Sequence, residues 1–170
     1  MKAAISKDMK FEPGDFVVYP SHGVGRVVDV EHRQIGADKL ELFVIAFDKD
    51  RMTLRVPLTK AKTSGLRKLS SKKIMETALT TLKGRSRVSR AMWNRRAQEY
   101  EAKINSGDPV SIAEVVRDLH RNAGQPDQSY SERQIYEAAL DRLARELAAV
   151  ERIDKDLATQ KLNSVLQKVA

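Results

Sequence analysis

A change in the spacing of apolar residues near positions 66–71 most constrains what this 170-residue chain can fold into. Before it, short apolar and β-branched runs are separated by turn signals such as Pro13-Gly14-Asp15, which is typical of β-strands. After it, apolar residues recur at helical spacing. The sequence therefore predicts an α+β chain of two domains. These are a small antiparallel β-barrel over residues 1–68 and an all-α domain of about five helices over residues 69–170.

Alternation in one apolar run predicts which way its side chains point. Met52, Leu54 and Val56 are separated by polar residues, so a strand of period two buries these three and directs Arg55 outward. Residues 40–47, by contrast, are almost wholly apolar. We expect these residues to form a strand that is buried on both faces.

Helical spacing in the second part predicts which residues face its core. Ile74, Ala78 and Leu82 share one face of the first expected helix. The next helix is expected to run from about residue 89 to residue 104, and the apolar face of the last helix includes Leu157.

The chain offers little for catalysis or for metal binding. It has no cysteine, and its three histidines, His22, His32 and His120, include no pair at the i, i+4 spacing of a helical metal site. Gly23 and Gly25 begin a dinucleotide-like string that lacks its third glycine, and this favours a turn before a strand. We therefore expect a protein that is not an enzyme and that needs neither a metal nor a cofactor.

Net charge and hydropathy bear on partners and location. The formal net charge of +8 favours an acidic partner, and nucleic acid is the commonest one, although the charge could also serve solubility alone. No apolar run approaches the ~18 residues that span a bilayer, and no apolar stretch follows basic residues 1–10 as it would in a signal peptide. We expect a soluble, cytoplasmic protein without membrane contact.

Residues 83–96 form a basic stretch that no acidic residue interrupts, and it holds the only tryptophan, Trp93. Its cations are Lys83, Arg85, Arg87, Arg90, Arg95 and Arg96. On a helix, Arg90, Trp93 and Arg96 fall on one face. Guanidinium groups can hold phosphates while a flat ring between them wedges into the minor groove of DNA. The alternative is that Trp93 packs in a core and that the arginines are merely solvated.

Three stretches of the chain form a pattern of motifs in a fixed order. They are Phe11-x-x-Gly14-Asp15-x-Val17-Val18-Tyr19-Pro20-x-His22-Gly23, then Leu54-Arg55-Val56-Pro57, and Trp93-x-Arg95-Arg96 followed by Ser106-Gly107-Asp108 and Ala113-Glu114-Val115-Val116-Arg117-Asp118-Leu119. In order and spacing these stretches resemble the CarD/CdnL family of bacterial transcription regulators. The resemblance extends over nearly the whole chain. Some members of the family carry a long disordered DNA-binding extension, and we expect the compact form without one.

The resemblance implies a fold and a mechanism. The N-terminal domain of the family is a Tudor-like barrel that binds the RNA polymerase β subunit, and a similar module occurs in the transcription-repair coupling factor. The C-terminal helical domain contacts promoter DNA at the upstream edge of the transcription bubble. Its tryptophan wedges into the minor groove, largely regardless of sequence, and slows collapse of the open complex. The protein would then be held at the nucleoid through polymerase.

Individual residues match the positions that carry these roles in the family. Trp93 matches the wedge, and Arg95 and Arg96 match the basic pair beside it. The spacing on a helix favours Arg96 as the closer neighbour of the ring. Arg33 and Arg55 match the polymerase-contacting arginines. The alternation of its strand independently places Arg55 outward, whereas it says nothing of Arg33.

Two other functions compete with a regulator that contacts both polymerase and DNA. One is an adaptor that binds polymerase through the barrel and another protein through the helices. The other is a role in repair through the shared barrel module, although no phosphate-binding Gly-x-x-x-x-Gly-Lys-Ser/Thr string of an ATPase motor occurs here. We expect a monomer, and a sheet edge that pairs with a second copy would instead make a dimer.

Overall fold

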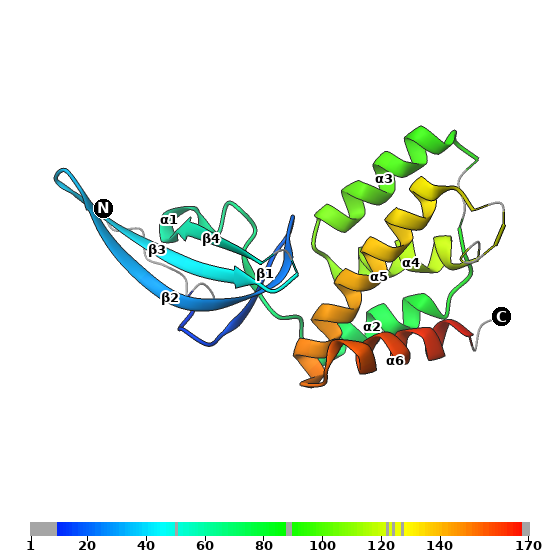
Figure 1. Cartoon of the computed structure of the whole chain (residues 1–170). Helices are drawn as coiled ribbons and strands as arrows, with labels where there is room; N and C mark the ends of the chain where they lie inside the picture. The colour runs from blue at the N-terminus through cyan, green and yellow to red at the C-terminus, as the bar shows by residue number, and fades with distance from the viewer. Residues whose placement is uncertain are drawn as a thin grey trace. The chain divides into compact units, whose positions relative to one another are not determined.

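The computed structural model describes residues 10–49, 51–87, 90–121, 123, 125, 126 and 128–167. The chain divides into two compact units, Met1–Leu69 and Ser70–Ala170, which are called here the sheet unit and the helical unit (Figure 1). The predicted α+β class, with strands followed by helices, is confirmed.

The sheet unit is a five-stranded antiparallel sheet in the order β4-β3-β2-β1-β5. Its elements are β1 Phe16–Tyr19, β2 Gly23–Ile35, β3 Asp38–Phe47, β4 Met52–Pro57, the short helix α1 Leu58–Ala61 and β5 Arg67–Lys68. The small antiparallel sheet is as predicted, but in the part of the chain that the structure describes it stays open and does not close into a barrel. The edge strand β5 has only two residues, too short to form a ladder with β4 at the other edge.

Burial in the sheet unit follows the predicted pattern. In β3, four consecutive residues from Leu42 to Ile45 are buried, so this central strand is covered on both faces as predicted. In β4, Val56 is buried while Met52 and Leu54 pack against the same core, and Arg55 is exposed. The alternation read from the sequence is therefore confirmed for this strand.

The helical unit contains the predicted number of helices within its described residues. They are α2 Lys72–Leu82, α3 Trp93–Asn105, α4 Pro109–His120, α5 Tyr130–Glu151 and α6 Lys155–Gln167. Helix α4 is the most buried and packs against α2, α3 and α5 (Figure 1). None of the described helices is both long enough and apolar enough to cross a membrane.

Two of the predicted core residues lie on the wrong face. Ile74 is 44% exposed, and its neighbour Met75 is buried instead. Leu157 is 51% exposed, and Ala158 is buried in its place. At both positions apolar residues are adjacent in sequence, about 100° apart on the helix, and the packing of neighbouring helices decides which of the two is buried.

Candidate functional site

Helix α3 begins at Trp93, not near residue 89 as predicted. Met92 is the N-cap and makes no capping hydrogen bond through its side chain. Arg90 lies in a bend before the helix, so the predicted face of Arg90, Trp93 and Arg96 on one helix is wrong; residues 88 and 89 lie outside the described residues. Arg90 and Met92 are exposed, so the residues just before Trp93 bury little apolar surface that would stabilise a further helical turn.

The ring of Trp93 is half-buried and held between the core and an arginine. It packs against the apolar core of the helical unit and lies 6.3 Å from the ring of Tyr100, at an interplanar angle of 48°. Arg96 places its guanidinium carbon 5.5 Å from the Trp93 ring centroid and 5.7 Å from that of Tyr100. One guanidinium nitrogen of Arg96 also donates a hydrogen bond to the Tyr100 hydroxyl, at 3.2 Å. The helical spacing thus correctly gave Arg96 as the neighbour of Trp93.

Exposed cations and one exposed apolar side chain lie close to Trp93 in the sequence. Arg90 is exposed, and the Arg95 side chain is 78% exposed, with a long 3.8 Å pair to Glu99. Met92, immediately before Trp93, is 82% exposed. No acidic residue occupies the first turn of α3. The residues Arg90, Met92, Trp93, Arg95 and Arg96, called here the α3 tip, therefore bring cations and exposed apolar surface to the start of α3.

A second cluster of arginines lies on the sheet unit. Glu31 accepts hydrogen bonds from Arg55 Nε at 3.2 Å and from a terminal nitrogen of Arg55 at 3.4 Å. A terminal nitrogen of Arg33 lies 3.2 Å from the same carboxylate. The hydrogen bond from Arg55 is the main cause that lowers the pKa of Glu31, so this carboxyl stays ionised at neutral pH. The structure thus brings together two arginines that are 22 positions apart in the sequence.

Glu31 was not identified in the sequence as part of this site. Its position two residues before Arg33 in β2 puts both on one face of the strand, and this spacing is the available signal. The register places Glu31 opposite Leu42 and Arg55 opposite Val44, so the cluster spans β2, β3 and β4. We call Glu31, Arg33 and Arg55 the sheet arginine cluster. Because all three side chains reach solvent, its ion pairs add little to stability and stay open to exchange with a partner.

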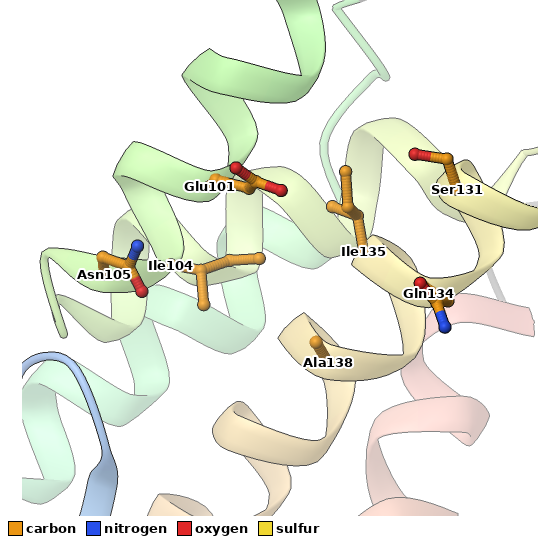
Figure 2. Close-up of a pocket in the computed structure, with 7 residues that line it drawn as sticks. All are labelled: Glu101, Ile104, Asn105, Ser131, Gln134, Ile135 and Ala138. Atoms are coloured by element: carbon orange, nitrogen blue, oxygen red, sulfur yellow. The ribbon is translucent and has the colours of Figure 1, made fainter.

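A pocket of about 360 Å³ lies between α3 and α5, at the other end of α3 from Trp93 (Figure 2). Its lining residues are Glu101, Ile104, Asn105, Ser131, Gln134, Ile135 and Ala138. The lining offers a single carboxylate, with amide, hydroxyl and apolar groups around it, and no histidine that could act as its acid–base partner. Within the described residues, no group of three histidine or carboxylate side chains is placed to hold a metal ion.

Each of the two units presents exposed arginines, which is typical of a protein with two binding surfaces. Residues 11–70 match the CarD-like/TRCF RID domain, and residues 77–163 match the CarD C-terminal domain. The chain belongs to the CarD family, so the resemblance seen in the sequence is confirmed. It is also similar to the Bacillus subtilis (strain 168) protein named "Putative transcription factor YdeB", with 27% identity over 143 residues, which cover 84% of this chain and 94% of that protein.

These matches give the chain its general role. The family is one of transcription factors, and the chain is a transcription regulator. The match of residues 11–70 to the RID domain also supports an interaction with RNA polymerase.

Proposed function

We propose that the protein binds the RNA polymerase β subunit through the sheet arginine cluster and contacts promoter DNA through the α3 tip, where Trp93 wedges into the minor groove and prolongs the life of the open complex. The observation that carries this proposal is the position of Trp93, half-buried at the start of α3, with exposed cations before and after it in the sequence. The two domains would then be a polymerase-binding unit and a DNA-contacting unit.

The Trp93 ring is held by its neighbours, as a wedge requires. A ring that separates base steps must bear the cost of unstacking, roughly a few kcal/mol, without moving aside. The core on one side and the guanidinium of Arg96 on the other restrict the ring before DNA arrives. Less conformational freedom is then lost on binding. The adjacent side chain of Met92 can extend the apolar contact with the opened base step.

The arginines of the α3 tip divide into two roles. Arg90 and Arg95 are exposed and would contact phosphates near the wedge. Arg96 is half-buried and bonded to Tyr100, so its main role is to support Trp93. Contacts to phosphate carry no base information, which fits a largely sequence-independent interaction with DNA.

The sheet arginine cluster would act as the tether. Binding of Arg33 and Arg55 to polymerase raises the effective concentration of the α3 tip at the promoter, so a weak affinity for DNA is sufficient. A wedge that binds melted DNA better than the closed duplex shifts the equilibrium between the closed and open complexes. The size of the shift is set by the difference between its affinities for the two states. A difference of about 1.4 kcal/mol would lengthen the open-complex lifetime about tenfold if it acted entirely on the collapse step.

The test is the lifetime of the open complex formed by purified polymerase on a ribosomal-type promoter, with wild type and Trp93→Ala compared. We expect wild type to prolong the lifetime and the folded variant to lose this effect. Tyr130→Ala is the matched control, because Tyr130 is another exposed aromatic side chain of the same unit, and it should behave as wild type. A Trp93→Ala protein that is folded and fully active would refute the wedge.

One observation favours the adaptor as a second candidate. Trp93 packs against the core of the helical unit, as a structural residue would. A fully buried tryptophan costs about 3–5 kcal/mol on replacement by alanine, and a half-buried one should cost less. If wild type binds polymerase without changing the open-complex lifetime, the adaptor is the better description and Trp93 is structural.

A further inference from the structure

The residues that lead from α2 towards the α3 tip carry cations that the proposed wedge does not use. Lys83, Arg85 and Arg87 are exposed, and they alternate with the half-buried Gly84 and Ser86. The segment 83–87 is not helical. We call it the basic segment. Exposed cations on a non-helical segment are ordinarily mobile, so what holds its backbone matters.

A buried carboxylate on another helix anchors one end of the basic segment. Asp118, on α4, accepts a hydrogen bond from the backbone N–H of Arg87 at 2.9 Å. The same oxygen accepts a hydrogen bond from Nε of Arg117 at 2.9 Å. The hydroxyl of Ser86 donates to the backbone carbonyl of Asp118 at 3.2 Å. The bonds from Arg87 and Ser86 to Asp118 join positions 31 and 32 residues apart in the chain.

The other end of the basic segment is fixed by the end of α2. The backbone N–H groups of Lys83 and Gly84 donate to the carbonyls of Thr80 and Thr81. A Cβ at Gly84 would lie 3.2 Å from the Thr81 carbonyl oxygen, so a larger residue would disturb this close approach. The backbone is therefore held at both ends, while the side chains of Lys83, Arg85 and Arg87 are exposed.

The burial of Asp118 indicates that the anchor matters. Its side chain is only 5% exposed, and a buried carboxylate is costly unless it is paired and hydrogen-bonded. The pairing with Arg117, itself largely buried, offsets the charge. The Asp118 oxygen that pairs with Arg117 also accepts the hydrogen bond from the Arg87 amide. The ion pair therefore helps to keep the basic segment in place.

We propose that the basic segment is a second phosphate-contacting arm, with Arg85 and Arg87 on the DNA backbone, and that Asp118 is the positioning residue that holds it. This inference rests on the DNA contact of the proposed function and extends that contact beyond the α3 tip. A backbone that is fixed before binding loses less conformational freedom when its arginines engage phosphates.

The first test is the salt dependence of binding by the full chain to a labelled duplex that contains a mismatched bubble. Each lost phosphate contact should reduce the magnitude of the slope of log affinity against log salt by about 0.9. We expect this reduction for Arg85→Ala and for Arg87→Ala. Arg133→Ala is the control, since Arg133 is an exposed arginine of α5 that pairs with Glu137, and its slope should equal that of wild type.

Unchanged slopes in both variants, together with weakened binding by Trp93→Ala, would overturn the arm and leave the wedge standing. A wild-type protein that does not bind the bubble even at low salt would overturn the proposed function, and the arm with it. The two failures are therefore distinguishable.

The second test separates two effects of Asp118: holding the backbone of the basic segment in place, and adding a negative charge near it. Asp118→Asn and Glu114→Gln each remove one negative charge from α4, and Glu114 is paired with Lys103 of α3 at 2.8 Å. Electrostatic attraction alone predicts tighter DNA binding by both variants. The anchor predicts that Glu114→Gln binds at least as tightly as wild type. Asp118→Asn should bind about fivefold more weakly, because its neutral amide oxygen is a weaker acceptor for the Arg87 N–H and no longer forms an ion pair with Arg117.

Two further readouts keep this test decisive. Hydrogen exchange of the Arg87 amide should accelerate in Asp118→Asn, while the emission of Trp93 stays that of wild type and shows an intact α3 tip. If Asp118→Asn does not fold, Ser86→Ala removes only the hydroxyl bond and should weaken binding in the same direction by a smaller factor. Binding equal to or tighter than wild type in the folded variant would overturn the role of Asp118.

Discussion

At the scale of single residues, Arg96 links the two aromatic rings of the α3 tip. Its guanidinium lies over both Trp93 and Tyr100, and its Nε is buried without a hydrogen-bond partner among the described residues. Contact with the two rings offsets part of the free-energy cost of this unmet hydrogen bond. The guanidinium of Arg96 therefore interacts mainly with groups of the protein itself.

Replacement of Arg96 by alanine should therefore expose Trp93. Because Trp93 is the only tryptophan, its fluorescence reports on this site alone. We expect a red-shifted emission, stronger quenching by acrylamide and a loss of about 1–2 kcal/mol in the free energy of unfolding. Arg95→Ala, one position away on the exposed face, should leave both the spectrum and the stability close to wild type. An unchanged spectrum in Arg96→Ala would refute the supporting role.

His120 makes the stability of the helical unit depend on pH. Its Nδ1 lies 2.8 Å from the hydroxyl of Tyr136, and burial lowers the pKa of His120 from its usual 6.5. Burial also raises the pKa of Tyr136 to about 12, so the hydroxyl keeps its proton and can donate to a neutral imidazole. Protonation of His120 would remove that acceptor.

The sign of the pH effect follows from where the proton binds. Above pH 6.5 the imidazole is neutral in both folded and unfolded chains, so the stabilisation is complete. Below it the unfolded chain takes up a proton first, and stability is lost as the pH falls through the lower pKa of the folded state, by at most about 1.4 kcal/mol per pH unit. Urea unfolding at about pH 7.5 and about pH 5.5 should show a larger loss for wild type than for His120→Gln. Equal losses would contradict this prediction.

The sequence predicted some of these residue contacts and not others, for a physical reason. Arg96 could be placed beside Trp93 because neighbours on one helix follow from its period. The outward direction of Arg55 followed in the same way from the alternation of β4. The pairing of Asp118 with Arg87, and of Glu31 with Arg55, depends on how separate elements pack, which no local period contains.

At the scale of elements, Gly25 shows why β2 needs a residue without a side chain. It lies in a strand, so the glycine string around it is not the start of a nucleotide-binding helix. A Cβ at Gly25 would lie 2.6 Å from a methyl carbon of Ile45 and 2.8 Å from the ring of Phe47. Both of these side chains are buried in the core of the sheet unit.

Gly25→Ala should therefore overpack this core. We expect a loss of about 1–3 kcal/mol in the free energy of unfolding, measured by urea denaturation. Val28→Ala on the same strand is the control, since Val28 is exposed, and it should change the stability by less than about 0.5 kcal/mol. A Gly25→Ala protein as stable as wild type would show that the strand can move away from Phe47 at little cost.

The elements themselves were predictable where local signals agree with packing. The strands and helices were found from their periods, but the start of α3 was not. The residues just before it include Met92, which is exposed and adds no packing that would stabilise a further turn. Asp108 and Ser129 cap α4 and α5 through their side chains, whereas Met92 at the start of α3 does not. That end of α3 departs from the usual rules for helix ends, as functional positions often do.

At the scale of the whole molecule, each unit has its own apolar core and its own cationic surface. A substitution in one surface should therefore leave the fold of the other unit intact. The proposed function needs both surfaces at once. The sheet unit would raise the effective concentration of the helical unit at the promoter, and the helical unit would act on the DNA. The effects of the tether and of the wedge should therefore depend differently on protein concentration.

A tether gives an effective concentration in the millimolar range at its target, which free protein must otherwise supply. Arg55→Ala should therefore shift the protein concentration that prolongs the open-complex lifetime to much higher values, while the lifetime reached at saturation stays that of wild type. Trp93→Ala should leave polymerase binding intact, yet fail to reach that lifetime at any concentration. Titration of both variants against the open-complex lifetime checks this. If excess protein does not rescue Arg55→Ala, the sheet arginine cluster does more than tether, and the two units act on the open complex as one.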